Sequence, residues 1–243
     1  MRIDKYLVEE GYFESRNRAL EAIKSGRVRV NAHRVKPSVR VDHNSHIEID
    51  DEKFFVSRAG RKLHAFFADH HIDITDKRAL DIGSSTGGFA QILLEGGISS
   101  LTCVDVGSDQ LHYSLRDDDR VSLYERIDIR EFETSEKFEV VSCDVSFISI
   151  MQVIDDIDRL STIGADIIIL YKPQFEVGKE VRRDSRGVVQ DIDAIERKKR
   201  EFETKAHSLG WTVEYQSLSE IRGKEGNQEY LYHFKKIDID ISS

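Results

Sequence analysis

The chain has 243 residues, of which 33% are charged and 39% hydrophobic, a balance that is typical of globular proteins and excludes a disordered or fibrous one. Its longest strongly apolar run, residues 167–171, is far shorter than the roughly 20 residues that a membrane span needs. The net charge of −9 is unevenly spread: residues 1–40 hold ten Lys or Arg and five Asp or Glu, which gives +5, and the remainder carries −14. A basic head on an acidic body indicates that the head binds a polyanion.

Residues 1–50 are predicted to form a small α+β domain. Helical spacing of apolar residues predicts two helices, the second capped by Ser15 and ended by Gly26. The predicted elements are a helix from Ile3 to Gly11, a helix over 16–24, and short strands over 28–30 and 33–36. Basic side chains crowd this unit, and our candidates for contacts with the polyanion are Arg2, Arg16, Arg18, Lys24, Arg27 and Arg29.

Beyond a charged linker at 51–57, apolar runs alternate with amphipathic stretches over residues 58–243. The predicted strands are 78–82, 101–106, 121–125, 139–144, 166–171, 211–217 and 229–234. The predicted helices are 60–70, 88–96, 148–160 and 193–208. This alternation predicts an α/β fold, a Rossmann-like, mostly parallel sheet with helices on both faces, in which ligands bind at the carboxyl ends of the strands.

A glycine-rich turn follows the first of these strands, and its spacing matches neither the dinucleotide fingerprint nor the phosphate P-loop. Gly87 and Gly88 lack Cβ atoms where a ligand could approach the backbone, although a plain turn could need them for its geometry alone. Asp105 ends the second strand, 22 residues after Gly83, where an acid is placed to bind ribose hydroxyls. The pattern predicts a nucleoside pocket without a pyrophosphate site, which fits S-adenosylmethionine. The candidate cofactor residues are Asp81, Gly83, Ser84, Ser85, Thr86, Gly87, Gly88, Phe89, Asp105, Val106 and Asp128.

Four charged residues lie at starts or ends of the predicted elements. Lys172 ends an apolar strand and precedes Pro173, and Asp144 ends the strand predicted over 139–144. Lys62 lies near the start of the first helix of the larger domain, and Glu229 begins the last strand. Partial burial of a lysine at a strand end favours its neutral form, which makes it a usable base. Each residue taken alone also has a purely structural interpretation.

Together these segments resemble the TlyA (haemolysin A) family of ribosomal RNA 2′-O-methyltransferases over nearly the whole chain. The segments that carry the resemblance include Leu80-Asp-Ile-Gly-Ser-Ser-Thr-Gly-Gly-Phe, Asp105-Val-Gly, Asp144-Val-Ser-Phe-Ile-Ser, Lys172-Pro-Gln-Phe-Glu and Glu225-Gly-Asn-Gln-Glu. The resemblance implies an RNA-binding domain at 1–50, of the kind named after a small-subunit ribosomal protein, and an FtsJ-type methyltransferase domain at 58–243. It also implies a catalytic tetrad of Lys62, Asp144, Lys172 and Glu229.

The chain departs from the family pattern at three places: Ala59 and Asp128 replace the usual glycine and asparagine, and residues 182–187 lack the usual Lys-Gly-Gly. We expect Lys172 to orient a ribose 2′-hydroxyl and take its proton, Asp144 to hold Lys172, and the other two residues to complete the frame. The basic cluster Arg182, Arg183 and Arg186 is expected to contact RNA near the active site.

The expected activity is S-adenosylmethionine-dependent methylation of a cytidine in large-subunit 23S rRNA, because the short chain beginning at Met1 resembles family members that modify only the large subunit. Methylation of small-subunit 16S rRNA as well is the less favoured possibility. Two alternatives stay open: a membrane-active cytolysin, and a non-catalytic RNA-binding factor for ribosome assembly. Acidic residues near the N-terminus argue against a signal peptide, and two cysteines do not make a disulfide framework. We therefore expect a cytoplasmic protein whose partners are ribosomal RNA and ribosomal subunits, without a metal site.

Overall fold

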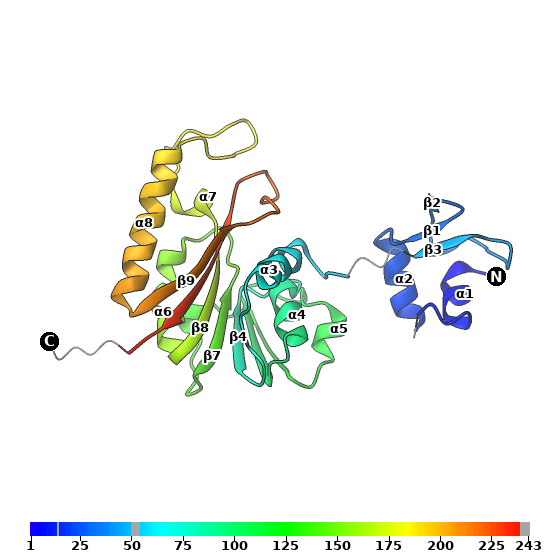
Figure 1. Ribbon diagram of the computed structural model, residues 1–243, viewed down its shortest axis with the longest axis horizontal. Coiled ribbons are helices and arrows are strands. Elements are labelled where there is room, and N and C mark those ends of the chain that lie inside the picture. Colours follow the sequence, from blue (N-terminus) through cyan, green and yellow to red (C-terminus); the bar gives the residue numbers. More distant parts are fainter. Residues whose placement is uncertain (14, 50–53, 239–243) are drawn as a thin grey trace. The chain divides into compact units, whose positions relative to one another are not determined.

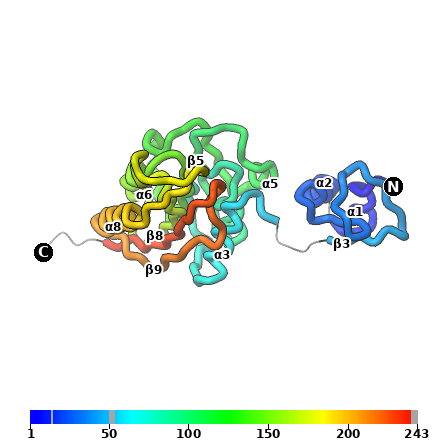
Figure 2. The backbone as a smooth tube through the Cα atoms, turned by 90° about the horizontal axis from the view of Figure 1, so that it is seen from above, coloured from blue at the N-terminus to red at the C-terminus, as the bar shows by residue number. Residues whose placement is uncertain are grey.

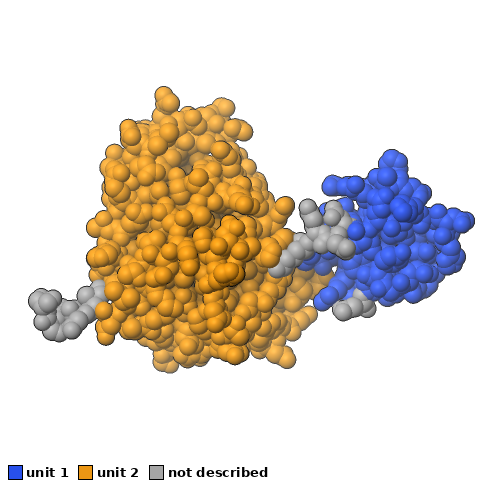
Figure 3. Space-filling view, viewed as in Figure 1, with its two compact units in different colours: residues 1–54 blue, residues 55–243 orange. Residues whose placement is uncertain are grey.

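The computed structural model describes residues 1–13, 15–49 and 54–238. These fall into two compact units, residues 1–54 and residues 55–243, which Figure 3 colours separately. The first three residues of the expected linker at 51–57 lie outside the described residues. None of the helices in the described ranges combines the length and the apolarity that crossing a bilayer requires.

The first unit packs two helices against a small antiparallel sheet with strand order β2-β1-β3. Its elements are α1 (Ile3–Glu9), α2 (Arg16–Lys24), β1 (Val28–Val30), β2 (His33–Arg34) and β3 (Ile47–Ile49). The Ser15 hydroxyl accepts a hydrogen bond from the backbone N–H of Arg18, as the predicted helix cap requires. Gly26 follows α2 with a φ of +78°, a conformation that favours glycine and ends the helix. Strand β3 was not predicted.

The second unit is a seven-stranded sheet with the order β6-β5-β4-β7-β8-β10-β9 and helices on both faces (Figures 1 and 2). The strands are β4 (Arg78–Ile82), β5 (Ser100–Asp105), β6 (Val121–Glu125), β7 (Phe138–Cys143), β8 (Ser161–Tyr171), β9 (Trp211–Leu218) and β10 (Tyr230–Lys236). The helices are α3 (Arg58–Asp69), α4 (Gly88–Glu95), α5 (Tyr113–Arg116), α6 (Ile154–Leu160), α7 (Pro173–Glu176) and α8 (Ile192–Ser208), with two 3-10 turns, η1 (Ile129–Glu131) and η2 (Ile150–Gln152). Strands β4 to β8 pair in parallel, and β10 is antiparallel to both its neighbours.

Strand β8 shows how this sheet joins two hydrophobic cores. Successive side chains of a strand point to opposite faces. Ile167, Ile169 and Tyr171 therefore pack in the core that contains α6 and α8. Ile168 and Leu170 pack in the other core, with α3 and α4. Burial on both faces explains the continuous apolar run of β8, and it confirms the predicted α/β class.

The predicted helix over 148–160 is wrong in its first half. The chain forms η2 and only then α6, with Val153 between them in a non-helical conformation (φ −123°, ψ −4°). The Glu176 carboxylate accepts hydrogen bonds from the Ser149 hydroxyl at 2.5 Å and from the backbone N–H of Ile150 at 2.8 Å. Glu176 lies outside the segment 148–160, so the apolar pattern of that segment could not show that these contacts would start η2 there.

Candidate functional site

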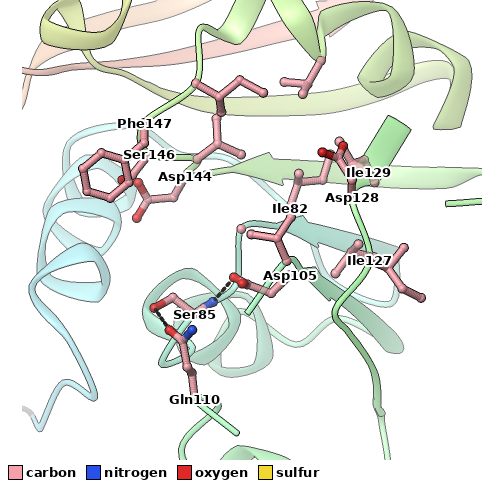
Figure 4. Close-up of a pocket in the computed structure, with 16 residues that line it drawn as sticks. Ile82, Ser85, Asp105, Gln110, Ile127, Asp128, Ile129, Asp144, Ser146 and Phe147 are labelled. Carbon is pink, nitrogen blue, oxygen red and sulfur yellow. Dashed lines mark hydrogen bonds between the residues drawn. The ribbon is translucent and has the colours of Figure 1, made fainter. Parts of the chain in front are cut away.

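The carboxyl ends of β4, β5 and β7 surround a cavity of about 330 Å³, here called the strand-end cavity (Figure 4). Its lining residues all lie between positions 82 and 153: Ile82, Gly83, Ser85, Val104, Asp105, Val106, Gln110, Ile127, Asp128, Ile129, Asp144, Val145, Ser146, Phe147, Ile148 and Val153. A volume of this size is within the usual range for small-molecule sites.

Asp105 is the acceptor that the sequence predicted at this cavity. Its carboxylate accepts hydrogen bonds from the backbone N–H of Ser85 at 2.7 Å and of Gly107 at 2.6 Å, which fix its orientation. A carboxylate has about four lone-pair sites, so both oxygens can still accept a bond from a ligand hydroxyl. Ser85 has a φ of +46° and donates its hydroxyl proton to Gln110 at 3.0 Å (Figure 4).

Asp128 supplies a second carboxylate, between two apolar side chains. It accepts the backbone N–H of Arg130 and two of that residue's guanidinium N–H groups, and these bonds to Arg130 lower the pKa of Asp128 below its ordinary value. Ile127 and Ile129 flank it and line the same cavity. A carboxylate for hydroxyls at Asp105 and an apolar wall beside Asp128 suit a nucleoside, so the residues present fit the adenosine part of S-adenosylmethionine.

Asp81 lies behind this cavity, contrary to its predicted place at the ligand. It is fully buried on β4 and accepts a hydrogen bond from the Ser142 hydroxyl at 2.6 Å. Burial is the largest influence on this carboxyl and raises its pKa to about 7. Ser84 and Phe89 are likewise buried, Phe89 in the core beside α4, while Thr86 is exposed.

Gly87 and Gly88 make room for neighbouring helices, whereas we predicted room for a ligand. A Cβ atom on Gly87, which has a φ of +92°, would press against Leu111 and Leu115. A Cβ atom on Gly88 would lie 2.7 Å from the backbone nitrogen of Gly60, in α3. The two glycines therefore allow close packing around the start of α4. At Gly83 a Cβ atom would meet the backbone of Asp144 at 3.1 Å, so that glycine brings β4 and β7 together at the cavity.

The four predicted tetrad residues form two ion pairs, in which Lys62, Lys172 and Glu229 are buried and the Asp144 side chain is 16% exposed. Lys172 Nζ lies 2.6 Å from Asp144 Oδ1, and the Lys62 ammonium pairs with the Glu229 carboxylate. Lys62 and Lys172 are each 8% exposed, and Glu229 is 3% exposed. Burial is the largest influence on Asp144 and raises its pKa, against the opposing effect of Lys172. The pairing of Asp144 with Lys172 was expected from the sequence, whereas the pairing of Lys62 with Glu229 was not.

A second cavity, of about 640 Å³, is lined by Lys62, Lys172 and Glu229 and is here called the basic cavity. It is lined by Arg58, Lys62, Ser146, Phe147, Lys172, Gln174, Phe175, Arg183, Arg186, Gly187, Gly223, Lys224, Glu225, Asn227 and Glu229. Ser146 and Phe147 line both cavities. Asp144 therefore faces the strand-end cavity while its partner Lys172 faces the basic cavity, and the ion pair joins the two.

The three arginines of the basic cluster after β8 have different surroundings. Arg183 donates to the backbone carbonyls of Gln174, Val177 and Gly187, so its guanidinium braces the surrounding chain. Arg186 lines the basic cavity with a side chain that is 71% exposed and pairs with Asp184 at 3.5 Å. Arg182 is exposed and does not appear in the cavity lining, among the residues that the structure describes.

In the first unit, two of the predicted RNA contacts also support the fold. Arg2 and Arg16 pair with the fully buried Asp4, at 3.0 Å and 2.7 Å. These partners hold the pKa of Asp4 below its ordinary value, against the desolvation that raises it. The side chains of the remaining candidates lie differently: Arg18, Lys24 and Arg29 are exposed, and Arg27 stacks on the Phe54 ring at 5.0 Å.

Several residues of the site were missed by sequence reasoning. Ser146 accepts a hydrogen bond from Lys172 Nζ at 2.7 Å, and Gln174 donates its amide to Glu229 at 2.8 Å. Phe147 is 91% exposed with a φ of +67°, an uncommon conformation for a bulky residue that clusters at functional sites. Each of these residues lies within a motif that was already identified, next to a tetrad residue. Arg58 and Lys224 lie in the segments around Lys62 and Glu229, but only the folded chain brings these two cations together at the basic cavity.

The chain is similar to known proteins over nearly its whole length. A family model described as FtsJ-like methyltransferase matches residues 55–236, and an S4 domain model matches residues 1–47. A relative from Campylobacter jejuni, named 23S rRNA (cytidine-2′-O)-methyltransferase TlyA, is 41% identical over 97% of this chain and 100% of its own length. A relative from Mycobacterium tuberculosis, named 16S/23S rRNA (cytidine-2′-O)-methyltransferase TlyA, is 36% identical over 95% of this chain and 88% of its own. The solved structure of a protein described as a hemolysin from Streptococcus thermophilus has a TM-score of 0.73 at 33% identity, covering 100% of this chain and 92% of that one.

Proposed function

Because this chain belongs to the TlyA family of FtsJ-like methyltransferases, we propose that it transfers the methyl group of S-adenosylmethionine to a ribose 2′-hydroxyl of ribosomal RNA. The observation that carries this proposal is the ion pair between Lys172 and Asp144, which joins a nucleoside-sized cavity to a larger basic one. A methyl donor in the first and a ribose in the second meet at that pair.

The strand-end cavity is proposed to hold S-adenosylmethionine. Asp105 accepts the ribose hydroxyls of the cofactor, and Ile127, Asp128 and Ile129 surround its adenine. The bound cofactor supplies an activated methyl group on a sulfonium. Most of the catalysis required of the protein is therefore alignment, which can lower a barrier by roughly 7–11 kcal/mol when reactants are held in the right geometry.

Lys172 orients the 2′-hydroxyl and removes its proton in this proposal. The ribose oxygen would take the methyl group of the bound cofactor, whose sulfonium would become a neutral thioether, and the hydroxyl proton would pass to the Lys172 amine. Asp144 holds Lys172 at the boundary of the two cavities. Lys62 and Glu229, buried in the wall of the basic cavity, complete the frame around the ribose.

RNA binding is assigned to both units. Residues 1–50 serve as the RNA-binding domain, with Arg18, Lys24, Arg27 and Arg29 as phosphate contacts, residues 51–57 as the linker, and residues 58–243 as the methyltransferase domain. The cations Arg58, Arg186 and Lys224 line the basic cavity and suit a phosphodiester strand. A ribosomal RNA substrate supports a cytoplasmic location for the protein.

The experiment that tests this function maps 2′-O-methylation on ribosomal RNA from cells with and without the protein, and on isolated subunits incubated with the protein and labelled cofactor. A cytidine of 23S rRNA is the expected target, as the name of the 41%-identical relative indicates. RNA binding without any methyl transfer would instead favour the ribosome-assembly alternative. Dye leakage from liposomes at comparable protein concentrations would favour the cytolysin alternative.

A further inference from the structure

We propose that the Ser146 hydroxyl is a positioning group for methyl transfer, which turns the lone pair of the Lys172 amine toward the ribose 2′-hydroxyl. The inference rests on the proposed function. It goes beyond the tetrad, because Ser146 belongs to neither ion pair. Figure 4 shows Ser146 beside Asp144 and Phe147, at the wall of the strand-end cavity.

The first argument is the geometry around Lys172 Nζ. This nitrogen lies 2.6 Å from Asp144 Oδ1 and donates a hydrogen bond to Ser146 Oγ at 2.7 Å. The four substituents of an sp³ nitrogen point in tetrahedral directions, and one of them is the carbon of the side chain. Ser146 holds one of the other three directions through the hydrogen bond, and the nearby Asp144 carboxylate attracts a second, which leaves one direction for the 2′-hydroxyl.

The remaining direction determines where the lone pair of the Lys172 amine points. A lysine in its amine form has two N–H donors and one lone pair. When Asp144 and Ser146 attract the two donors, the lone pair occupies the remaining direction and is available for the 2′-hydroxyl proton. Without Ser146, one donor has no assigned partner at this nitrogen, and the amine group can rotate so that the lone pair points away.

The second argument is the position of Ser146 between the cavities. Only two residues, Ser146 and Phe147, appear in the linings of both cavities among the described residues. The methyl group must cross this boundary if the cofactor and the ribose occupy the cavities as proposed. The Ser146 oxygen accepts from Lys172, so its own proton is directed elsewhere.

The third argument is that the loop carrying Ser146 is held to the segment carrying Lys172 by independent contacts. Glu176, four residues after Lys172, accepts hydrogen bonds from Ser149 and from the backbone N–H of Ile150. These contacts fix the distance between the two segments without using Lys172 itself. A reactive group supported in this way is pre-organised before the substrate binds.

The test compares Ser146→Ala, Ser146→Thr and Ser149→Ala in the full-length protein, by single-turnover methyl transfer to ribosomal RNA at saturating S-adenosylmethionine. Ser146→Ala is expected to slow the reaction about tenfold or more, since misplacing a reacting group by about 1 Å can reduce a rate 10²-fold. Its affinity for cofactor and for RNA should stay within about twofold of wild type, because its hydrogen-bond partner is Lys172. Ser146→Thr keeps the hydroxyl and should recover most of the rate.

The matched control, Ser149→Ala, changes a hydroxyl of the same loop that contacts Glu176. It should lose less rate than Ser146→Ala, because the backbone N–H of Ile150 still donates to Glu176 and holds the loop. Thermal unfolding of all three variants checks that they are folded. A Ser146→Ala enzyme with more than half of the wild-type rate overturns the inference, and so does an equal loss in Ser149→Ala. If the wild type itself transfers no methyl group, the proposed function fails as well, so the two failures are distinguishable.

Discussion

Removing one member of the buried Lys172–Asp144 pair should destabilise the protein more than removing both. At 2.6 Å and an effective dielectric constant near 20, the attraction between two unit charges is about 6 kcal/mol before desolvation is counted. Desolvation offsets most of this, since the side chains are only 10% and 16% exposed. Breaking a buried pair by removing one partner costs about 3–5 kcal/mol, because a charge is left buried alone, while replacing both is often close to neutral.

The variants are Lys172→Met, Asp144→Ala and the double variant, compared by urea unfolding. We expect each single variant to lose about 3 kcal/mol and the double variant to recover most of that loss. Burial already raises the pKa of Asp144, and losing Lys172 removes an influence that lowers it. The carboxyl of Lys172→Met therefore takes up a proton more easily, so this variant should be more stable at pH 5 than at pH 8, relative to wild type.

Methyl transfer should follow a different pattern from stability. The two side chains act as one unit, so all three variants should lose at least about 10² in single-turnover rate, and the double variant should be scarcely slower than either single one. Recovered stability without recovered turnover separates the chemical role from the structural one. A Lys172→Met enzyme that keeps more than about a tenth of the rate would falsify the assigned chemistry, and additive stability losses would contradict the pairing energetics.

Asp105→Ala should weaken S-adenosylmethionine binding by about 1.5–3 kcal/mol, measured by calorimetry, while the exposed Asp119→Ala serves as the control and should leave it unchanged. Asp81→Asn should stabilise the protein at pH 8 by up to about 4 kcal/mol and much less at pH 4, because the wild-type carboxyl, with its pKa raised from 3.8 to about 7, loses stability as the pH rises between those values; a stability difference independent of pH would contradict this. Replacing both Lys24 and Arg29 by Ala should reduce the slope of log affinity for ribosomal RNA against log salt by about 0.7–0.9 per lost phosphate contact, and an unchanged slope would remove them from the interface.

The strands of the larger unit could be predicted because burial on both faces leaves nearly continuous apolar runs, as in β8. Lys172 and Asp144 could be placed because each directly follows such a run, and parallel strands bring their carboxyl ends to one edge. The predicted ends of these strands were less accurate than their locations in the chain. β8 begins at Ser161, five residues before the predicted start, and Val106 lies beyond the end of β5 with 70% of its surface exposed.

What the sequence could not predict depends on contacts between distant segments. The glycines of the turn could be identified, but the atoms that they make room for could not, since Gly60 and Leu115 approach only in the folded chain. The sequence does not distinguish Arg183 from its basic neighbours. In the folded chain, its guanidinium donates hydrogen bonds to the backbone carbonyls of three residues. Of the three clustered arginines, Arg183 therefore supports the fold, while Arg182 and Arg186 remain candidates for binding RNA.

The two cavities are lined by different parts of the chain. The strand-end cavity is lined entirely by residues between positions 82 and 153. The basic cavity draws on residues from position 58 to position 229, and the Lys62–Glu229 pair joins residues 167 positions apart. Glu229 directly precedes β10, which lies between β8 and β9, so this pair requires the last strands to be in place. The frame proposed to hold the ribose therefore depends on the fold of the whole unit, whereas the lining of the strand-end cavity comes from its central segment.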